Sequence, residues 1–168
     1  MEFKAVAKAV CIAATILCAQ ATQANLVTNG DFSNGSVGWT LTGNQELSSF
    51  DRGYWSNGAI GSDAFLSQII GTTAGEIYNI SFDAVINWGR IGAMLDGLTF
   101  FTAYSSGHYE TTVAAKNDNA LLTFFTHNDP SYNGLYNVSG DEKVPEPASL
   151  ALVGLGLAGL VASRRRKS

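Results

Sequence analysis

The sequence predicts an all-β fold: a single jelly-roll or β-sandwich domain, flanked by an N-terminal signal-peptide helix and a short C-terminal transmembrane helix. Three observations support this prediction. Apolar and polar residues alternate with a period of two along the central part of the chain. Clusters of Gly, Asn, Asp and Ser interrupt this alternation at near-regular intervals. Residues 25–141 show no long amphipathic helical pattern.

Residues 1–24 have the anatomy of a secretory signal peptide. Two lysines precede an apolar stretch from residue 9 to residue 19, and small residues follow at cleavage spacing. We expect export through the Sec machinery, with cleavage after Ala24 or, as the near alternative, after Ala21. A helix that belongs to the folded core is the competing interpretation.

Charge is distributed unevenly along the chain. Six of the ten Lys and Arg lie in the two terminal segments, so residues 25–143 carry four basic against twelve acidic side chains, a net charge of −8. An acidic domain repels phosphate backbones, which argues against nucleic acid as a partner. Both cysteines, Cys11 and Cys18, lie in the signal peptide, so the mature domain would depend on its core without a disulfide.

Four strands follow from the pattern. Residues 76–87, EIYNISFDAVIN, alternate most clearly. The segments DGLTFFTAY at 96–104 and NALLTFFTHN at 119–128 are rich in Thr, Phe and Leu, as strands are, and AFLSQIIG at 64–71 gives a further short strand. In the first of these strands one face is apolar, and it comprises Tyr78, Ile80, Phe82, Ala84 and Ile86.

A family resemblance begins with NLVTNGDFSNGSVGWTLTGN at residues 25–44. This segment is similar to the opening of bacterial exported jelly-roll domains related to carbohydrate-binding modules. In that family an Asn-Gly-(Asp/Ser)-Phe stretch precedes a Gly-Trp pair. LSQIIGTTAGEIYNISFDA at 66–84 and LLTFFTHNDPSYNGLYNVSG at 121–140 resemble later strands of the same family, in the same order. The matching residues of the opening are Asn29, Gly30, Asp31, Phe32, Gly38 and Trp39.

In sugar-binding relatives an acidic residue after the first Phe and another in the last strand help to hold a structural calcium ion. Here Ser33 takes the first position, and Tyr136 and Asn137 take the last. Calcium requires about six to eight oxygen ligands and favours carboxylates. We therefore expect no cofactor and no metal, with calcium as the less favoured alternative.

Catalytic candidates are few. His127, Asn128 and Asp129 invite a metal or catalytic interpretation, but the only other histidine is His108 and no thiol accompanies them. THNDPS at 126–131 is better interpreted as a polar turn after a strand. No nucleophile elbow, phosphate loop or zinc-protease helix is present, and no pair among the acids is distinguished as a glycosidase pair. We expect no catalytic residues and no enzyme activity.

Aromatic side chains are the better functional lead, because sugar rings present C–H faces that stack on Trp and Tyr. Tyr54 and Trp55 fall in a predicted Gly-rich loop, Trp88 stands at a predicted strand end, and Tyr132 follows another turn, as does Tyr136. The first four are the candidate carbohydrate-contacting residues. For Trp55 and Trp88 a place in the core is an equally open interpretation, whereas Trp39 is expected in the core.

The C-terminal segment, residues 144–168, combines three unlike elements in order. A Pro-Glu-Pro triplet precedes fifteen uncharged residues, 148–162, and a basic tail follows. As a helix those fifteen residues would span about 22 Å, less than the roughly 30 Å of a bilayer core. Three glycines lower the helix propensity of residues 148–162. The triplet is Pro145, Glu146 and Pro147, and the arginines are Arg164, Arg165 and Arg166.

This tripartite tail is very similar to the PEP-CTERM sorting signal of Gram-negative bacteria. The resemblance implies transient anchoring in the inner membrane, recognition by an exosortase-type membrane protease, and removal of the tail near the triplet. It also implies an association with exopolysaccharide, biofilm or floc formation. On this basis we expect an exported, non-enzymatic protein of the cell surface or extracellular matrix that binds carbohydrate. A small secreted glycoside hydrolase and a structural matrix protein without a specific ligand are the alternatives.

Overall fold

A computed structural model describes residues 24–58, 60–129 and 131–143. These residues fall within one compact unit, Gln23–Lys143. The predicted signal peptide, apart from Ala24, and the whole of the segment 144–168 lie outside the described residues. Within the described ranges, no helix has the length and apolar character that crossing a bilayer requires.

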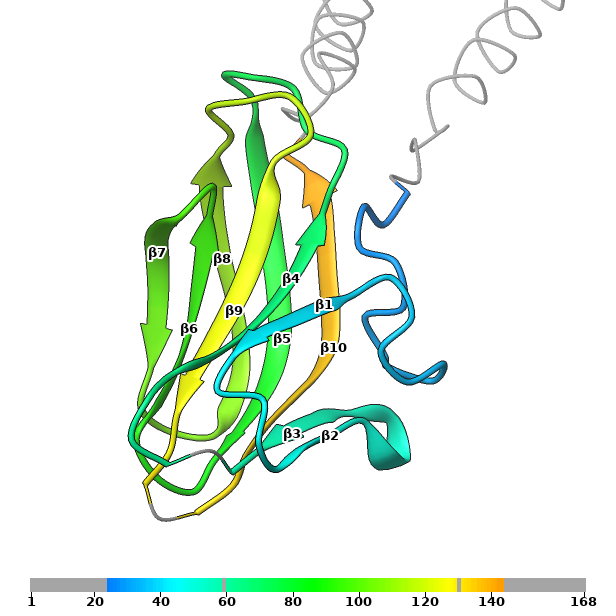
Figure 1. The fold of residues 1–168 in the computed structure, drawn as a ribbon. Helices are drawn as coiled ribbons and strands as arrows, with labels where there is room; N and C mark the ends of the chain where they lie inside the picture. The colour runs from blue at the N-terminus through cyan, green and yellow to red at the C-terminus, as the bar shows by residue number, and fades with distance from the viewer. Residues whose placement is uncertain (1–23, 59, 130, 144–168) are drawn as a thin grey trace, which may run out of the picture. The chain divides into compact units, whose positions relative to one another are not determined.

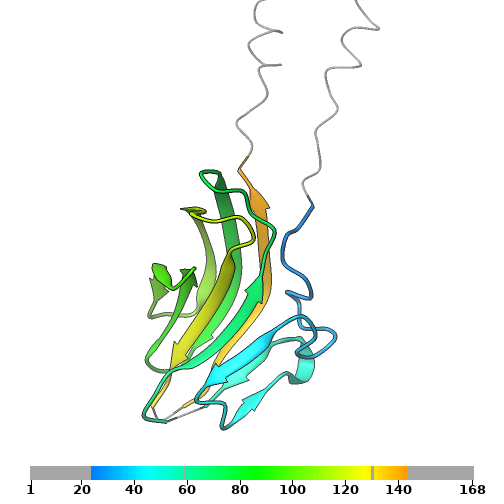
Figure 2. The ribbon, with the colours of Figure 1, turned by 45° about the horizontal axis from the view of Figure 1, so that its top comes forward.

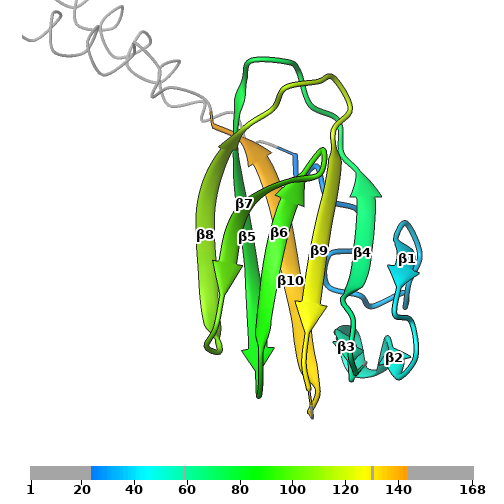
Figure 3. The ribbon, with the colours of Figure 1, turned by 60° about the vertical axis from the view of Figure 1, so that its left-hand side comes forward.

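The described residues form two five-stranded antiparallel sheets (Figure 1), which confirms the all-β prediction. Figure 2 and Figure 3 show the two sheets as facing layers. One sheet has the order β1-β4-β9-β6-β7, with bounds Thr40–Gly43, Ala64–Ile69, Leu121–His127, Arg90–Leu95 and Leu98–Ala103. The other has the order β2-β3-β10-β5-β8, with bounds Ser48–Ser49, Trp55–Asn57, Asn133–Glu142, Ile77–Ile86 and Gly107–Ala114. A single 3-10 turn, η1 at Asp51–Gly53, precedes β3.

Strand β5 shows directly how the sequence pattern builds the core. Its apolar face is confirmed, because Tyr78, Ile80, Phe82 and Ala84 are each at most 2% exposed. The intervening residues lie on the outer face of the sheet, where Ser81 shares a hydrogen bond with a serine of β10. A strand with one buried face must keep its register, since a shift of one residue would exchange the two faces.

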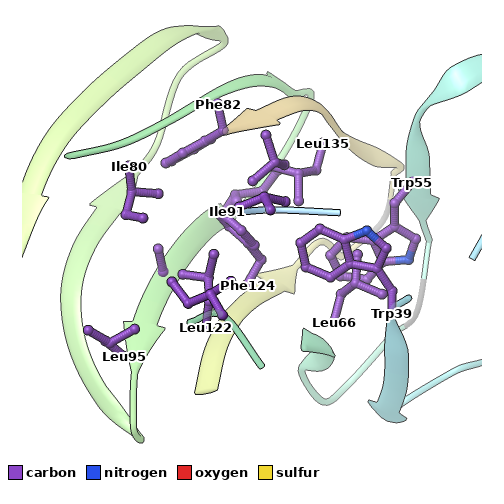
Figure 4. Close-up of a cluster of buried hydrophobic side chains, with 14 of the residues drawn as sticks. Trp39, Trp55, Leu66, Ile80, Phe82, Ile91, Leu95, Leu122, Phe124 and Leu135 are labelled. Carbon is purple, nitrogen blue, oxygen red and sulfur yellow. The ribbon is translucent and has the colours of Figure 1, made fainter. Parts of the chain in front are cut away.

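The core lies between the two sheets and is rich in aromatic rings (Figure 4). Phe82 of one sheet meets Phe124 of the other edge to face, with ring centroids 5.1 Å apart. Trp39 packs on Phe124 at 6.3 Å and is 8% exposed, which confirms its predicted place in the core. Because the core cluster runs from Val27 to Val138, we expect this unit to fold by itself.

The turn between β6 and β7 is a two-residue hairpin loop, Asp96-Gly97. Both residues have positive φ, 49° and 77°, as a tight hairpin of the primed type requires. The Asp96 carboxylate also accepts hydrogen bonds from the Leu121 backbone N–H and from the Asn117 side chain, both at 2.8 Å. The loop is therefore fastened to the start of β9.

The sequence pattern predicted β4, β5, β7 and β9, and the family resemblance at 121–140 covered most of β10, but the other strands were not predicted. The largest omission is β6, a central strand between β7 and β9, in which Ile91, Ala93 and Leu95 point inward. Its segment, RIGAML, is short and contains a glycine, which weakens a strand signal. The predicted Gly-rich loop around Trp55 is also wrong: Trp55 opens β3 and pairs with Leu135 of β10.

Candidate functional site

A groove of about 290 Å³ lies on the outer face of the sheet that contains β3, β10 and β5, where β10 begins and β5 ends. Gly134 of β10 stands between Ser56 of β3 and Val85 of β5 in the strand register. Since Gly134 has no side chain, the sheet is hollow at this point. The groove is lined by Tyr54, Ser56, Val85, Asn87, Tyr132, Asn133, Gly134 and Tyr136.

The lining chemistry is aromatic and uncharged. Three tyrosines, at 54, 132 and 136, line the groove, and Ser56 and Asn87 contribute neutral hydrogen-bonding groups. A tyrosine ring offers a broad apolar face with a polar group at its tip. Such a groove suits a flat, neutral molecule that has both apolar faces and hydroxyl groups.

A buried amide holds the loops at this end of the sandwich. Asn133 is 2% exposed. Its Oδ1 accepts hydrogen bonds from the backbone N–H groups of Asn87 and Trp88, at 3.0 and 3.4 Å, and its Nδ2 donates to the Trp88 carbonyl at 2.8 Å. Asn87 in turn donates from Nδ2 to the Tyr132 carbonyl at 2.6 Å. The β5–β6 and β9–β10 connections are therefore fixed to each other.

The four candidate aromatic residues have different locations. Tyr54 and Tyr132 line the groove together. Trp88 is 62% exposed on the β5–β6 connection, next to the groove residue Asn87 but outside the lining itself. Trp55 is 1% exposed and belongs to the core (Figure 4), so its proposed contact with sugar is corrected: no ligand can reach its ring.

Tyr54 lines the groove and Trp55 does not, because successive side chains of β3 point to opposite faces of the sheet. Trp55 and Asn57 point inward, whereas Tyr54 and Ser56 lie on the groove side of the sheet. Ser56, Asn87 and Gly134 were not predicted as site residues, and Tyr136 was not among the four candidates. Once β10 is recognised as a strand, its period of two places Gly134 and Tyr136 on the same face.

Asp63, Asp129, Arg90 and His127 form a polar cluster that does not line the groove. Asp63 accepts from Arg90 at 3.1 Å, and its other oxygen is 2.7 Å from His127 Nδ1. His127 Nε2 is 3.7 Å from Asp129, whose carboxylate accepts from the Gly61 backbone at 3.0 Å. The cluster joins the β3–β4 connection to β6 and β9. The segment predicted as a polar turn overlaps the end of β9 at His127 and enters the connection to β10, which begins at Asn133.

Neutral residues occupy the two positions that were compared with acidic calcium ligands of the sugar-binding relatives. Ser33 is exposed, and its backbone N–H and hydroxyl both bind the Asp31 carboxylate, at 3.2 and 3.0 Å. Asn137 donates from its amide to Asp83 at 2.7 Å. Across the described ranges, no group of three or more His, Cys, Asp and Glu side chains could hold a metal ion. These residues do not fit a calcium ion of that type.

The tail is identified by its match to a protein-family model. Residues 143–167 match the family described as the PEP-CTERM protein-sorting motif. The chain carries a PEP-CTERM motif. The predicted resemblance of the tail is thereby confirmed, and the motif indicates a secreted protein that passes through the membrane and is sorted to the cell surface. No curated protein sequence matches the chain.

Solved structures similar to this chain show its fold. The carbohydrate-binding module TmCBM61, solved with β-1,4-galactotriose, superposes with a TM-score of 0.56 at 13% identity, over 71% of this chain and 99% of that one. The N-terminal cellulose-binding domain of Cellulomonas fimi β-1,4-glucanase C gives a TM-score of 0.50 at 15% identity, over 73% and 100%. The predicted likeness to jelly-roll carbohydrate-binding modules is confirmed.

Part of an enzyme domain is similar in fold. The enzymatically active domain of the bacteriophage CBA120 tailspike protein 4 gives a TM-score of 0.51 at 17% identity, over 70% of this chain. The chain spans only 21% of that tailspike domain. At these identities the likeness concerns the fold, so function has to be argued from the groove.

Proposed function

We propose that this domain is an exported, non-enzymatic module that binds a neutral polysaccharide in the tyrosine-lined groove. The observation that supports the proposal is the groove itself, in which three tyrosines and neutral amide and hydroxyl groups surround Gly134. Tyrosine rings can stack on the C–H faces of sugar rings, while Ser56 and Asn87 can bond their hydroxyl groups. The volume is close to the lower end of small-ligand sites, about 300 Å³, which suits a short stretch of a longer chain.

The electrostatics favour a neutral glycan over an anionic one. None of the groove residues carries a formal charge. Asp83 stands opposite Tyr136 in the register between β5 and β10, so the next position along the sheet is acidic. The domain as a whole has a charge of −8 between residues 25 and 143. A polymer of uronic acids would approach against this field.

Hydrolysis is the alternative activity, since one similar structure is an enzyme domain. Glycoside hydrolysis ordinarily requires two carboxyl groups, one on each side of the scissile bond. No Asp or Glu is among the residues that line the groove. This composition supports binding without catalysis, and a structural matrix protein with no ligand is the remaining alternative.

Replacement of Tyr136 by alanine is expected to weaken binding about 30-fold, the size of a 2 kcal/mol contact. Binding should be measured by titration calorimetry with residues 23–143 and a panel of neutral β-glucans, galactans, a polyuronate and the producing cell's own exopolysaccharide. The control is Tyr104→Ala, because Tyr104 is 74% exposed and does not line the groove. Equal losses for both variants, or no binding of any neutral polymer by the wild type, would contradict the proposal.

Export and processing form the second part of the proposal. We infer that residues 1–24 are removed during Sec-dependent export, and that an exosortase-type protease removes the tail near Pro145-Glu146-Pro147. The protein would then remain at the surface or in the exopolysaccharide matrix of a Gram-negative cell. The intact mass of protein recovered from the cell exterior is expected to match about residues 25–145. Recovery of an unprocessed tail in a membrane fraction would contradict this inference.

A further inference from the structure

We propose that Gly58 is a positioning residue that sets the ring of Tyr132 as one wall of the groove. The inference rests on the proposed function and adds to it a residue that need not touch the polysaccharide. Gly58 follows β3 directly and is buried. Tyr132 precedes β10, is 49% exposed and lines the groove. Two segments 74 positions apart in the sequence are therefore in contact beside the site.

The contact is too close for any other residue at position 58. A β-carbon on Gly58 would lie 2.5 Å from Cε1 of Tyr132, 2.7 Å from Cζ and 2.8 Å from Cδ1. Carbon atoms without a bond between them separate to about 3.5–4.0 Å. The flat side of the Tyr132 ring therefore lies against the α-carbon of Gly58, and a methyl group there would displace the ring by about 1 Å.

The backbone at Gly58 gives no separate reason for glycine. Its φ lies outside the positive range that L-residues avoid, unlike that of Gly61, which is +85° and has no atom within 4 Å of a β-carbon. Alanine could therefore adopt the Gly58 backbone conformation, and the nearest obstacle to its β-carbon is the Tyr132 ring. The absence of a side chain at position 58 is explained by the ring.

The main chain of Tyr132 is held by its neighbours. Its carbonyl accepts the hydrogen bond from Asn87 Nδ2 at 2.6 Å, and the next residue is the buried Asn133. With the main chain held from the β5–β6 side, the response to a methyl group falls on the ring. Ordering a flexible side chain on binding costs conformational entropy. A Tyr132 ring that is already fixed avoids this cost.

Gly58→Ala is expected to weaken polysaccharide binding about tenfold while the unfolding midpoint stays close to that of the wild type. Gly71→Ala is the matched control, since Gly71 has no positive φ and no atom within 4 Å of a β-carbon. Titration calorimetry on residues 23–143 should be repeated in a Tyr132→Ala background. If Gly58 acts through the ring, the tenfold effect of Gly58→Ala disappears there, because the double-mutant cycle removes the shared contact.

Nuclear magnetic resonance supplies a readout that does not need the ligand. The α-protons of Gly58 should be shifted upfield by the Tyr132 ring in the wild type and should return to ordinary values in Tyr132→Ala. Wild-type binding with an unchanged affinity for Gly58→Ala, or an equal loss in both backgrounds, overturns this inference and leaves the proposed function standing. Ordinary α-proton shifts in the wild type also overturn it. Failure of the wild type to bind any polysaccharide overturns the proposed function instead.

Discussion

Replacement of Trp55 by alanine is expected to lower the free energy of unfolding by about 3–5 kcal/mol, the cost of removing a large buried aromatic side chain. Trp55 is 1% exposed, and its indole Nε1 lies 3.4 Å from the hydroxyl of Ser48. Its truncation would open a cavity between the sheets that the surrounding side chains can only partly fill. Urea denaturation of residues 23–143, followed by circular dichroism, measures the change.

Trp88→Ala is the control for Trp55→Ala. Trp88 is 62% exposed on the β5–β6 connection, and surface substitutions of this kind change stability by only about 0.5 kcal/mol. The two variants remove the same side chain, so the difference between them isolates burial. Equal effects on stability would show that Trp55 does not occupy the core position described above.

Replacement of Gly89 by alanine is expected to lower the free energy of unfolding by about 3 kcal/mol or more. Two costs combine at this position. Gly89 has a φ of +73°, which is unfavourable for alanine by about 1–2 kcal/mol. A β-carbon there would also lie 1.9 Å from the backbone carbonyl oxygen of His127. The β5–β6 turn would have to move away from the end of β9, and Asn133 would lose its hydrogen bonds to the Trp88 backbone.

Gly97→Ala separates these two costs. Gly97 has nearly the same φ, +77°, but no atom lies within 4 Å of a β-carbon. Only the conformational cost of about 1–2 kcal/mol applies to it. The comparison of denaturation curves for Gly89→Ala and Gly97→Ala therefore measures the steric term. If Gly97→Ala were as damaging as Gly89→Ala, the close approach of the β5–β6 turn to His127 would be refuted.

The gap between sequence and structure is clearest at Tyr54 and Trp55. The sequence could identify both as residues that contact a sugar, because the two aromatic residues stand among turn-forming residues. It could not assign them to opposite faces, since β3 is only three residues long and pairs with β10 across the fold. That pairing set Gly134 beside Ser56, and the pairing of β10 with β5 set it beside Val85, so the two pairings together created the groove.

Local chemistry was sufficient for several conclusions about this protein. The period of two in β5 determined a half-buried strand, because side chains on a strand alternate between two faces whatever their partners. The ordered tail, with its Pro-Glu-Pro triplet, short apolar run and arginines, determined the sorting motif at residues 143–167, because that motif is a contiguous stretch of chain. The acidic charge followed from composition alone.

Only the tertiary structure decided where a ligand could bind. The groove is assembled from β3, β10, β5 and two connections that are distant in the sequence. Its essential features are the lack of a side chain at Gly134 and the contact of the Tyr132 ring with Gly58. Such features depend on which strands become neighbours and at what register, and pairing between distant segments leaves no periodic signal in the chain. For that reason the sequence could predict an aromatic site, but the pairing of the strands determined which aromatic residues line it.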